Sequence, residues 1–216
     1  ILGKGQLSLA KYLLIANEAD QPNIHDIQSF FIHLLERINW NRDVHFQTET
    51  SIDTLDNSSK EINIGSKVIW ACTGEPIRKL SDILPELDPS LEAAVVSKGI
   101  LAIKGEKSEN YNEAPIEIDR IIETLGVSFD SDLYPLVIVC DDPKFLAADF
   151  NNFLWATFTR SNPSHDIYGI GAKTEFKHWG CSGSLIIDAR FKRHNAPPLL
   201  EDEAVSASVD QLLKNI

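Results

Sequence analysis

The chain has 216 residues, 43% of them hydrophobic, and a formal net charge of −12. This composition is ordinary for a globular protein of one large or two small domains. The acidic balance argues against nucleic acids and anionic membranes as partners, because basic clusters supply the affinity for both. No apolar run approaches the ~20 residues needed to span a bilayer. The N-terminus lacks the features of a signal peptide.

The sequence contains no methionine, so we expect that it was cut from a longer protein. Its three cysteines, Cys72, Cys140 and Cys181, are far apart. They form neither a disulfide framework nor a zinc pattern, which would need paired ligands at short spacing. A reducing, cytoplasmic setting is therefore predicted, with all three as structural thiols.

The first part of the chain predicts a strand, a helix and two further strands. The run from Lys11 to Asn17 contains a continuous apolar stretch, as in a strand that is covered on both faces. Asp26 is a plausible N-cap of a helix with an apolar face at three- and four-residue steps. Further strands are expected at residues 44–46 and, after Gly65-Ser66, at residues 68–72.

Residues 74–130 form a predicted connecting segment. It should hold a short helical piece around residues 77–84 and one or two short strands between Ala93 and Ile103. Pro115 suits the first turn of a helix, and Gly126 suits its C-terminal stop.

The last part predicts a strand at residues 136–140 and a helix capped by Asp149. Strands are then expected at residues 167–170 and 184–189. A final helix should begin near Asp202, with its apolar side chains facing inward: Val205, Val209, Leu212 and Leu213.

The two strand–helix segments resemble each other. An offset of 123 residues places Leu14-Ile15 on Val137-Ile138, and it aligns the following pairs: Asp26 with Asp149, Arg37 with Arg160, and Asp43 with Asp166. An offset of 118 then aligns Gly65-Ser66 with Gly183-Ser184. We interpret this as a duplicated strand–helix–strand unit, which predicts an α/β fold with a mixed, mainly parallel sheet covered by helices. The expected organisation is a first repeat at 1–73, a connecting segment at 74–130, and a second repeat with a C-terminal helix at 131–216.

Two Arg–Asp pairs and one lysine could have a functional role. Arg37 with Asp43, and Arg160 with Asp166, flank the ends of the two helices. Each Arg could complement the helix dipole and hold the next loop through the Asp, or it could bind a substrate carboxylate. Lys4 lies between glycines and could touch a phosphate, although the spacing of a phosphate loop is missing. The alternative for Lys4 is a solvated terminal lysine.

The segment from His178 to Ser184 could hold a nucleophile. The segment does not match the G-x-S-x-G motif of a nucleophile elbow, because Ser184 occupies the position of the last glycine. Two interpretations stay open: Cys181 is a nucleophile with His178 as its base, or the segment is a Gly-rich turn that leads into a strand. The histidines show no metal spacing and no carboxylate pair stands out as acid and base, so the residues predict no self-contained active site.

Several motifs in this order resemble the C-terminal region of UbiD-type decarboxylases. In the second repeat they are the apolar strand with Asp141-Asp142, Leu154-Trp155-Ala156, Thr159-Arg160, Pro163, Asp166 and the run from Gly183 to Arg190. In the first repeat they are the run from Gly5 to Lys11 and Gly65-Ser66-Lys67. Each repeat departs from the family pattern. The first has Ile32-His33, Glu36-Arg37 and Trp70-Ala71 at motif positions, and the second has Leu185 in place of the lysine.

The resemblance implies a parent enzyme that reversibly decarboxylates an aromatic or α,β-unsaturated acid, such as 3-polyprenyl-4-hydroxybenzoate in quinone biosynthesis. Such enzymes use prenylated flavin mononucleotide, Mn²⁺ and a monovalent cation. Their catalytic residues and metal ligands precede this region, so the resemblance places none here. Lys4 is the nearest match to a basic residue that reaches the cofactor phosphate.

The resemblance also implies that this C-terminal region mediates homo-oligomerisation and closes over an upstream flavin-binding domain. The first hypothesis is therefore the C-terminal part of a carboxy-lyase, inactive and free of cofactor when alone. The alternative is a non-catalytic interaction or assembly module. A third hypothesis is a thiol enzyme built on Cys181.

Overall fold

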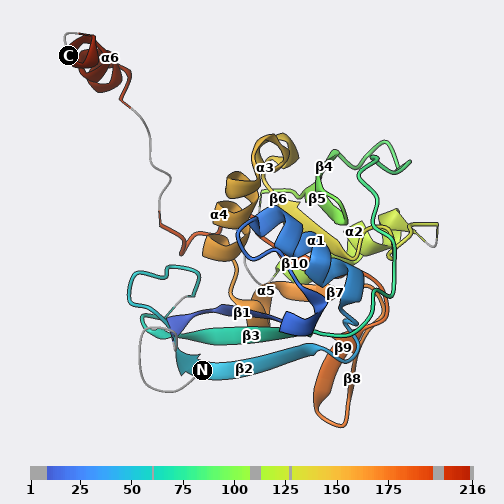
Figure 1. Ribbon diagram of the computed structural model, residues 1–216. Coiled ribbons are helices and arrows are strands. Elements are labelled where there is room, and N and C mark those ends of the chain that lie inside the picture. The colour runs from blue at the N-terminus through green and yellow to red at the C-terminus, as the bar shows by residue number, and fades with distance from the viewer. Residues whose placement is uncertain (1–8, 60, 108–112, 127, 197–201, 215–216) are drawn as a thin grey trace.

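The chain folds into two mixed β-sheets that share one hydrophobic core (Figure 1). The computed structural model describes residues 9–59, 61–107, 113–126, 128–196 and 202–214. Lys4 therefore lies outside the described residues. The smaller sheet, sheet A, has the strand order β1-β3-β2 and consists of β1 (Tyr12–Ala16), β2 (Val44–Ser51) and β3 (Ile64–Cys72).

The larger sheet, sheet B, has the order β4-β5-β6-β10-β7. Its strands are β4 (Ala93–Ser97), β5 (Ile100–Lys104), β6 (Leu136–Cys140), β7 (Ile167–Gly169) and β10 (Leu185–Asp188). A separate hairpin joins β8 (Ala172–Glu175) to β9 (His178–Cys181). The predicted α/β class with mixed sheets is confirmed. Among the described strands of sheets A and B, however, three pairings are parallel and three antiparallel, so the sheets are only partly parallel.

Aspartate side chains begin most of the helices. Asp26, Asp142, Asp149 and Asp202 each accept backbone N–H groups at a helix N-terminus, which satisfies donors that have no partner inside the helix. The helices are η2 (Glu18–Asp20), α1 (Ile27–Arg37), α2 (Ala114–Leu125), α3 (Pro143–Ala148), α4 (Phe150–Arg160), α5 (Pro163–Asp166) and α6 (Glu203–Leu213). α2 ends at Gly126 with a φ of 69°, as its predicted stop requires.

The structure corrects two local predictions and adds a helix that was not predicted. Residues 77–84 form no helix: the Ser81 N–H, which a helix would direct to Ile77 O, donates to Leu133 O instead. α3, which Asp142 and Pro143 begin, was missed. α6 forms as predicted, but its apolar face is exposed rather than inward, since Val205 and Leu212 are 59% and 67% exposed.

Two parts of the chain share one topology. The first unit consists of β1, α1, β2 and β3, and the second unit contains β6, α4, β7 and β10 in the same order. In both units the first strand is parallel to the last strand, and the middle strand is antiparallel to the last. A common origin by duplication stays a prediction.

The strand register corrects the alignment of the two units. Tyr12 pairs with Val68, and Leu136 pairs with Leu185. Tyr12 and Leu136 both face the shared core, so they are counterparts at an offset of 124 residues rather than 123. Val68 then corresponds to Leu185, an offset of 117 rather than 118. A one-residue slip moves every side chain to the other face of a sheet, so the strand alignment predicted from sequence was wrong.

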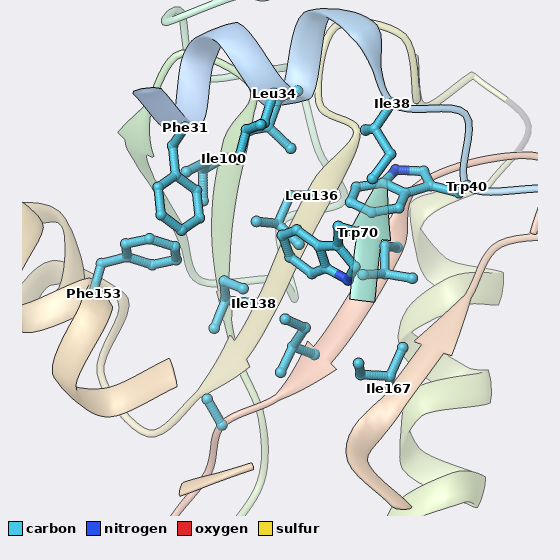
Figure 2. Close-up of a cluster of buried hydrophobic side chains, with 14 of the residues drawn as sticks. Phe31, Leu34, Ile38, Trp40, Trp70, Ile100, Leu136, Ile138, Phe153 and Ile167 are labelled. Carbon is cyan, nitrogen blue, oxygen red and sulfur yellow. The ribbon is translucent and has the colours of Figure 1, made fainter. Parts of the chain in front are cut away.

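The shared core lies between the inner faces of the two sheets and helices α1 and α4 (Figure 2). Trp70 of β3, Leu136 of β6 and Phe31 of α1 are all at most 1% exposed within it. A second cluster lies on the other face of sheet B, where α2 packs on Val137, Val139 and Ile186. Sheet B is therefore covered on both faces.

Candidate functional site at the junction of the two units

Polar side chains from both units meet where β1 and β3 begin and α4 ends. We call this group the polar junction. Its members from the first unit are Lys11, Tyr12, Asp56, Ser58 and Ser66, and those from the second unit are Ser161, Asn162, Ser164, Asp166 and Lys192. Most are buried, so their hydrogen bonds decide whether the junction is stable.

Lys11 directs its ammonium group into the loop that follows β2. Its Nζ lies 2.7 Å from Ser58 Oγ and 2.9 Å from an Asp56 carboxylate oxygen. The side chain is nearly buried, and this burial lowers the pKa of Lys11, whereas the Asp56 charge acts in the opposite direction. The loop of residues 56–58 is thereby fixed against the first strand.

Hydroxyl groups connect the first unit to the loop after α4. The Ser161 hydroxyl donates to Thr157 O at 2.6 Å, so the Tyr12 hydroxyl must be the donor in its 2.7 Å contact with Ser161 Oγ. Ser66 Oγ donates to Asn162 Oδ1 and accepts the Ser164 N–H at 2.8 Å. Strands β1 and β3 are thus both joined to this loop.

Lys192 holds the segment that follows β10. Its Nζ donates to the backbone oxygens of Asp188 at 2.7 Å and Arg160 at 3.2 Å, and it lies 3.3 Å from Asp166 Oδ1. The residue is 3% exposed, and Asp166 is fully buried. A buried ammonium group surrounded by oxygen atoms is well compensated, which makes Lys192 a structural centre of the junction.

Arg190 forms a second buried ion pair beside the junction. Its Nε and Nη2 atoms donate to the two oxygens of Asp188 at 2.9 and 2.8 Å. Arg190 also contacts Glu117 of α2, which links sheet B to its covering helix. Burial lowers the pKa of Arg190 to about 10, so the group keeps its charge at neutral pH.

The predicted pairs Arg37–Asp43 and Arg160–Asp166 do not form among the described residues. Arg37 lies 3.2 Å from Glu36 Oε2, and Arg160 lies 2.9 Å from Asp141 Oδ2. The two aspartates hold the loops directly instead. Asp43 accepts the Asn39 N–H at 2.8 Å, and Asp166 accepts the Asn162 N–H at 2.6 Å. The equivalent bonds show that both aspartates serve loop structure.

The hypothesis of a thiol enzyme is contradicted by the surroundings of Cys181. The residue is 1% exposed, and its Sγ donates to Gly183 O at 3.5 Å. Burial raises the pKa of Cys181 to about 12, so the thiolate is scarce at neutral pH. In the part of the chain that the structure describes, His178 Nε2 has no hydrogen-bond partner, and its ring lies beside His45. Cys72 and Cys140 are also free and buried, as predicted.

The described residues do not fit a Mn²⁺ site. Across the ranges that the structure covers, no three His, Cys, Asp or Glu residues are placed to hold a metal ion. Within the same ranges, none of the helices is long and apolar enough to cross a membrane.

A groove of about 500 Å³ runs beside the polar junction. Leu55 and Trp155 on its two sides are 85% and 50% exposed, and the Arg160 guanidinium lies 5.1 Å from the centre of the Trp155 ring. Both units and the segment after β10 contribute to its walls. The lining residues are Asp53, Leu55, Asp56, Asn57, Trp155, Phe158, Thr159, Arg160, Phe191, Asn195 and Ala196.

Sequence reasoning missed both the polar junction and the groove. Lys11 and Lys192 lie 181 positions apart, and no local pattern connects them. The available signal was that Lys11 lies directly before the first strand and Lys192 lies four residues after the end of β10. Isolated lysines near strand ends are usually solvated, so the signal was weak.

The fold and the junction define a two-unit α/β module whose notable polar side chains are buried and structural. Residues 1–72 match the family described as the 3-octaprenyl-4-hydroxybenzoate carboxy-lyase C-terminal domain. This match confirms the predicted resemblance to the C-terminal region of UbiD-type decarboxylases.

Two relatives and one solved structure extend the comparison. An uncharacterized protein of Chlamydia trachomatis serovar D is 32% identical over 170 residues, covering 78% of this chain and 27% of that protein. A 4-hydroxybenzoate decarboxylase subunit from Chlamydia pneumoniae is 31% identical over 195 residues, covering 89% of this chain and 31% of that protein. The chain thus spans less than a third of each of these relatives. The Sedimentibacter hydroxybenzoicus vanillic acid decarboxylase is 19% identical, with coverage of 54% and 27% and a TM-score of 0.34.

Proposed function

We propose that the chain is the C-terminal part of a UbiD-like carboxy-lyase that acts on an aromatic acid such as 3-polyprenyl-4-hydroxybenzoate. In this role it supports oligomerisation and closes over an upstream flavin-binding domain. The family match over residues 1–72 and the name of the Chlamydia pneumoniae relative support the enzyme class. That this relative is named as one subunit of a decarboxylase also supports assembly with other chains.

The observation that carries this proposal is the contrast between the buried polar junction and the exposed apolar groove. Lys11, Asp166 and Lys192 hold the two units together and are at most 8% exposed, so they cannot meet a substrate. Trp155 and Leu55 instead present apolar surface at the groove. An exposed apolar surface of this kind is typical of a contact with another domain or chain.

The cofactors belong to the upstream domain in this proposal. Prenylated flavin mononucleotide and Mn²⁺ would bind there, and Lys4 is the residue of this chain proposed to approach the cofactor phosphate. The isolated chain should therefore bind neither group tightly. We further propose a cytoplasmic location, in keeping with three free cysteines.

The groove can be tested in the longer protein that contains this chain. The variant Trp155→Ala with Leu55→Asp should lower decarboxylation of an aromatic acid at least about tenfold, since a well-packed aromatic contact at an interface is worth ~2 kcal/mol or more. Circular dichroism should stay unchanged. Phe176→Ser is the matched control, because Phe176 is fully exposed at the β8–β9 hairpin. Equal activity of the groove variant and the control would contradict the closure role.

The alternative, a non-catalytic assembly module, predicts a different result. The longer protein would then show no decarboxylation with any aromatic acid, while the groove variant would still lose its partner in size-exclusion chromatography. The two functions are thus distinguished by activity of the unaltered longer protein.

A further inference from the structure

The two sheets differ in how their outer faces are covered. On sheet B, the face that points away from the shared core carries Val137, Val139 and Ile186, and each is 0% exposed. On sheet A, the register gives Leu13, Ile15 and Ile69 as their counterparts. These three side chains are only partly buried. The apolar side chains on the outer face of sheet A are therefore less buried than their counterparts on sheet B, although Lys67 on the same face is only 4% exposed.

The cover on sheet B is the amphipathic helix α2. Ile118, Ile121 and Leu125, at steps of three and four residues, form its buried stripe and belong to one cluster with the outer face of sheet B. Equivalent sheet faces of equivalent units call for the same kind of cover, because an apolar sheet face must be buried against another layer. The missing layer on sheet A is therefore expected to be an amphipathic helix like α2.

The strand edges show the same difference. β6 pairs with β5 on one side and with β10 on the other. Its counterpart β1 pairs with β3 alone among the described strands. In the second unit, both the pairing strand β5 and the covering helix α2 come before β6 in the chain. The elements that would complete the first unit are therefore expected before β1.

We propose that the outer face of sheet A binds an amphipathic helix that directly precedes Ile1 in the longer protein. The offset of 124 that aligns Tyr12 with Leu136 places the end of the counterpart of α2 at Ile1 and the rest of that helix before it. The relatives are longer than this chain, which covers 27% and 31% of their lengths, and residues 1–72 match a family described as a C-terminal domain. We rely on the proposed function only for the existence of a longer protein.

α6 is a less suitable occupant, although its apolar face is exposed. It follows the second unit, whereas the covering helix of the second unit precedes its first strand. Figure 1 also shows α6 apart from sheet A and beyond the opposite side of the molecule. The upstream helix, by contrast, is joined directly to the strand whose face it would cover.

Thiol labelling tests the proposal without reference to enzymatic activity. Ile69→Cys places a reporter on the outer face, while the three native cysteines are buried and unreactive. We expect a maleimide to label this thiol in the 216-residue chain and to react at least about tenfold more slowly in the longer protein, because labelling would then require local opening. Ile15→Cys on the neighbouring strand is the second variant and should behave alike.

Two control variants give the labelling rates of a fully exposed and a fully buried thiol. Phe176→Cys, at a fully exposed position, should react equally fast in both proteins, and Ile186→Cys, beneath α2, should be protected in both. Equal rates for Ile69→Cys in the two proteins would overturn the proposal. Protection already present in the 216-residue chain would also overturn it. Removal of residues after Ala196 would then identify α6 as the cover, and a dependence on protein concentration would identify a second copy.

Discussion

Replacement of Lys192 by methionine should be the most damaging single change in the polar junction. The variant Lys192→Met keeps the length of the side chain but removes the ammonium group. The Asp188 and Arg160 oxygens, at 2.7 and 3.2 Å from Nζ, lose a donor, and the fully buried Asp166 loses a charge partner at 3.3 Å. Removal of one partner of a buried ion pair typically costs about 3–5 kcal/mol.

The loss can be measured by thermal and denaturant unfolding of the 216-residue chain. For a protein of this size each kcal/mol lowers Tm by about 2–4 °C, so a decrease of roughly 6–20 °C is expected. Lys173→Met is the matched control. Lys173 forms an ion pair with Glu175 in which both side chains are about half exposed, and such pairs contribute at most ~1 kcal/mol. If Lys192→Met lowered Tm no more than this control, the junction would not hold the units together.

Three further changes probe the junction and the core. Tyr12→Phe should cost about 1 kcal/mol in denaturant unfolding, because it removes one buried hydrogen bond to Ser161, and no effect would mean that the contact is weak. Leu185→Lys, which restores the lysine of the family motif, should cost more than about 3 kcal/mol, because it buries a charge in the core. A stable variant would refute the corrected register, in which Ser184 rather than Leu185 corresponds to Lys67. Cys181 should stay unreactive toward Ellman's reagent up to about pH 10, because burial raises its pKa to about 12, and fast labelling at pH 8 would contradict this.

The sequence predicted the elements of both units well because local signals agreed with the tertiary structure. Asp26 and Asp149 cap α1 and α4, and the continuous apolar run before Cys140 forms the fully buried strand β6. Failures occurred where a distant partner decided the outcome. Residues 77–84 form no helix, because Leu133 O accepts the Ser81 N–H that a helix would need.

The alignment of the two units failed for a similar reason. The helix caps and the residues at the helix ends match at an offset of 123, and the strands were aligned at the same offset, whereas their register needs 124 and 117. Apolar runs of β-branched residues match equally well in either register, so only the pairing of strands decides which side chains face the core. The polar junction could not be predicted from the sequence either, because its members lie far apart in the chain.

Decarboxylation by the isolated chain tests the central claim most directly. Release of CO₂ from 4-hydroxybenzoate and related aromatic acids can be compared between the longer protein and the 216-residue chain, each supplied with prenylated flavin mononucleotide and Mn²⁺. We expect turnover by the longer protein and none by the chain alone, because its buried polar side chains cannot reach a substrate. Measurable turnover by the isolated chain would contradict the account.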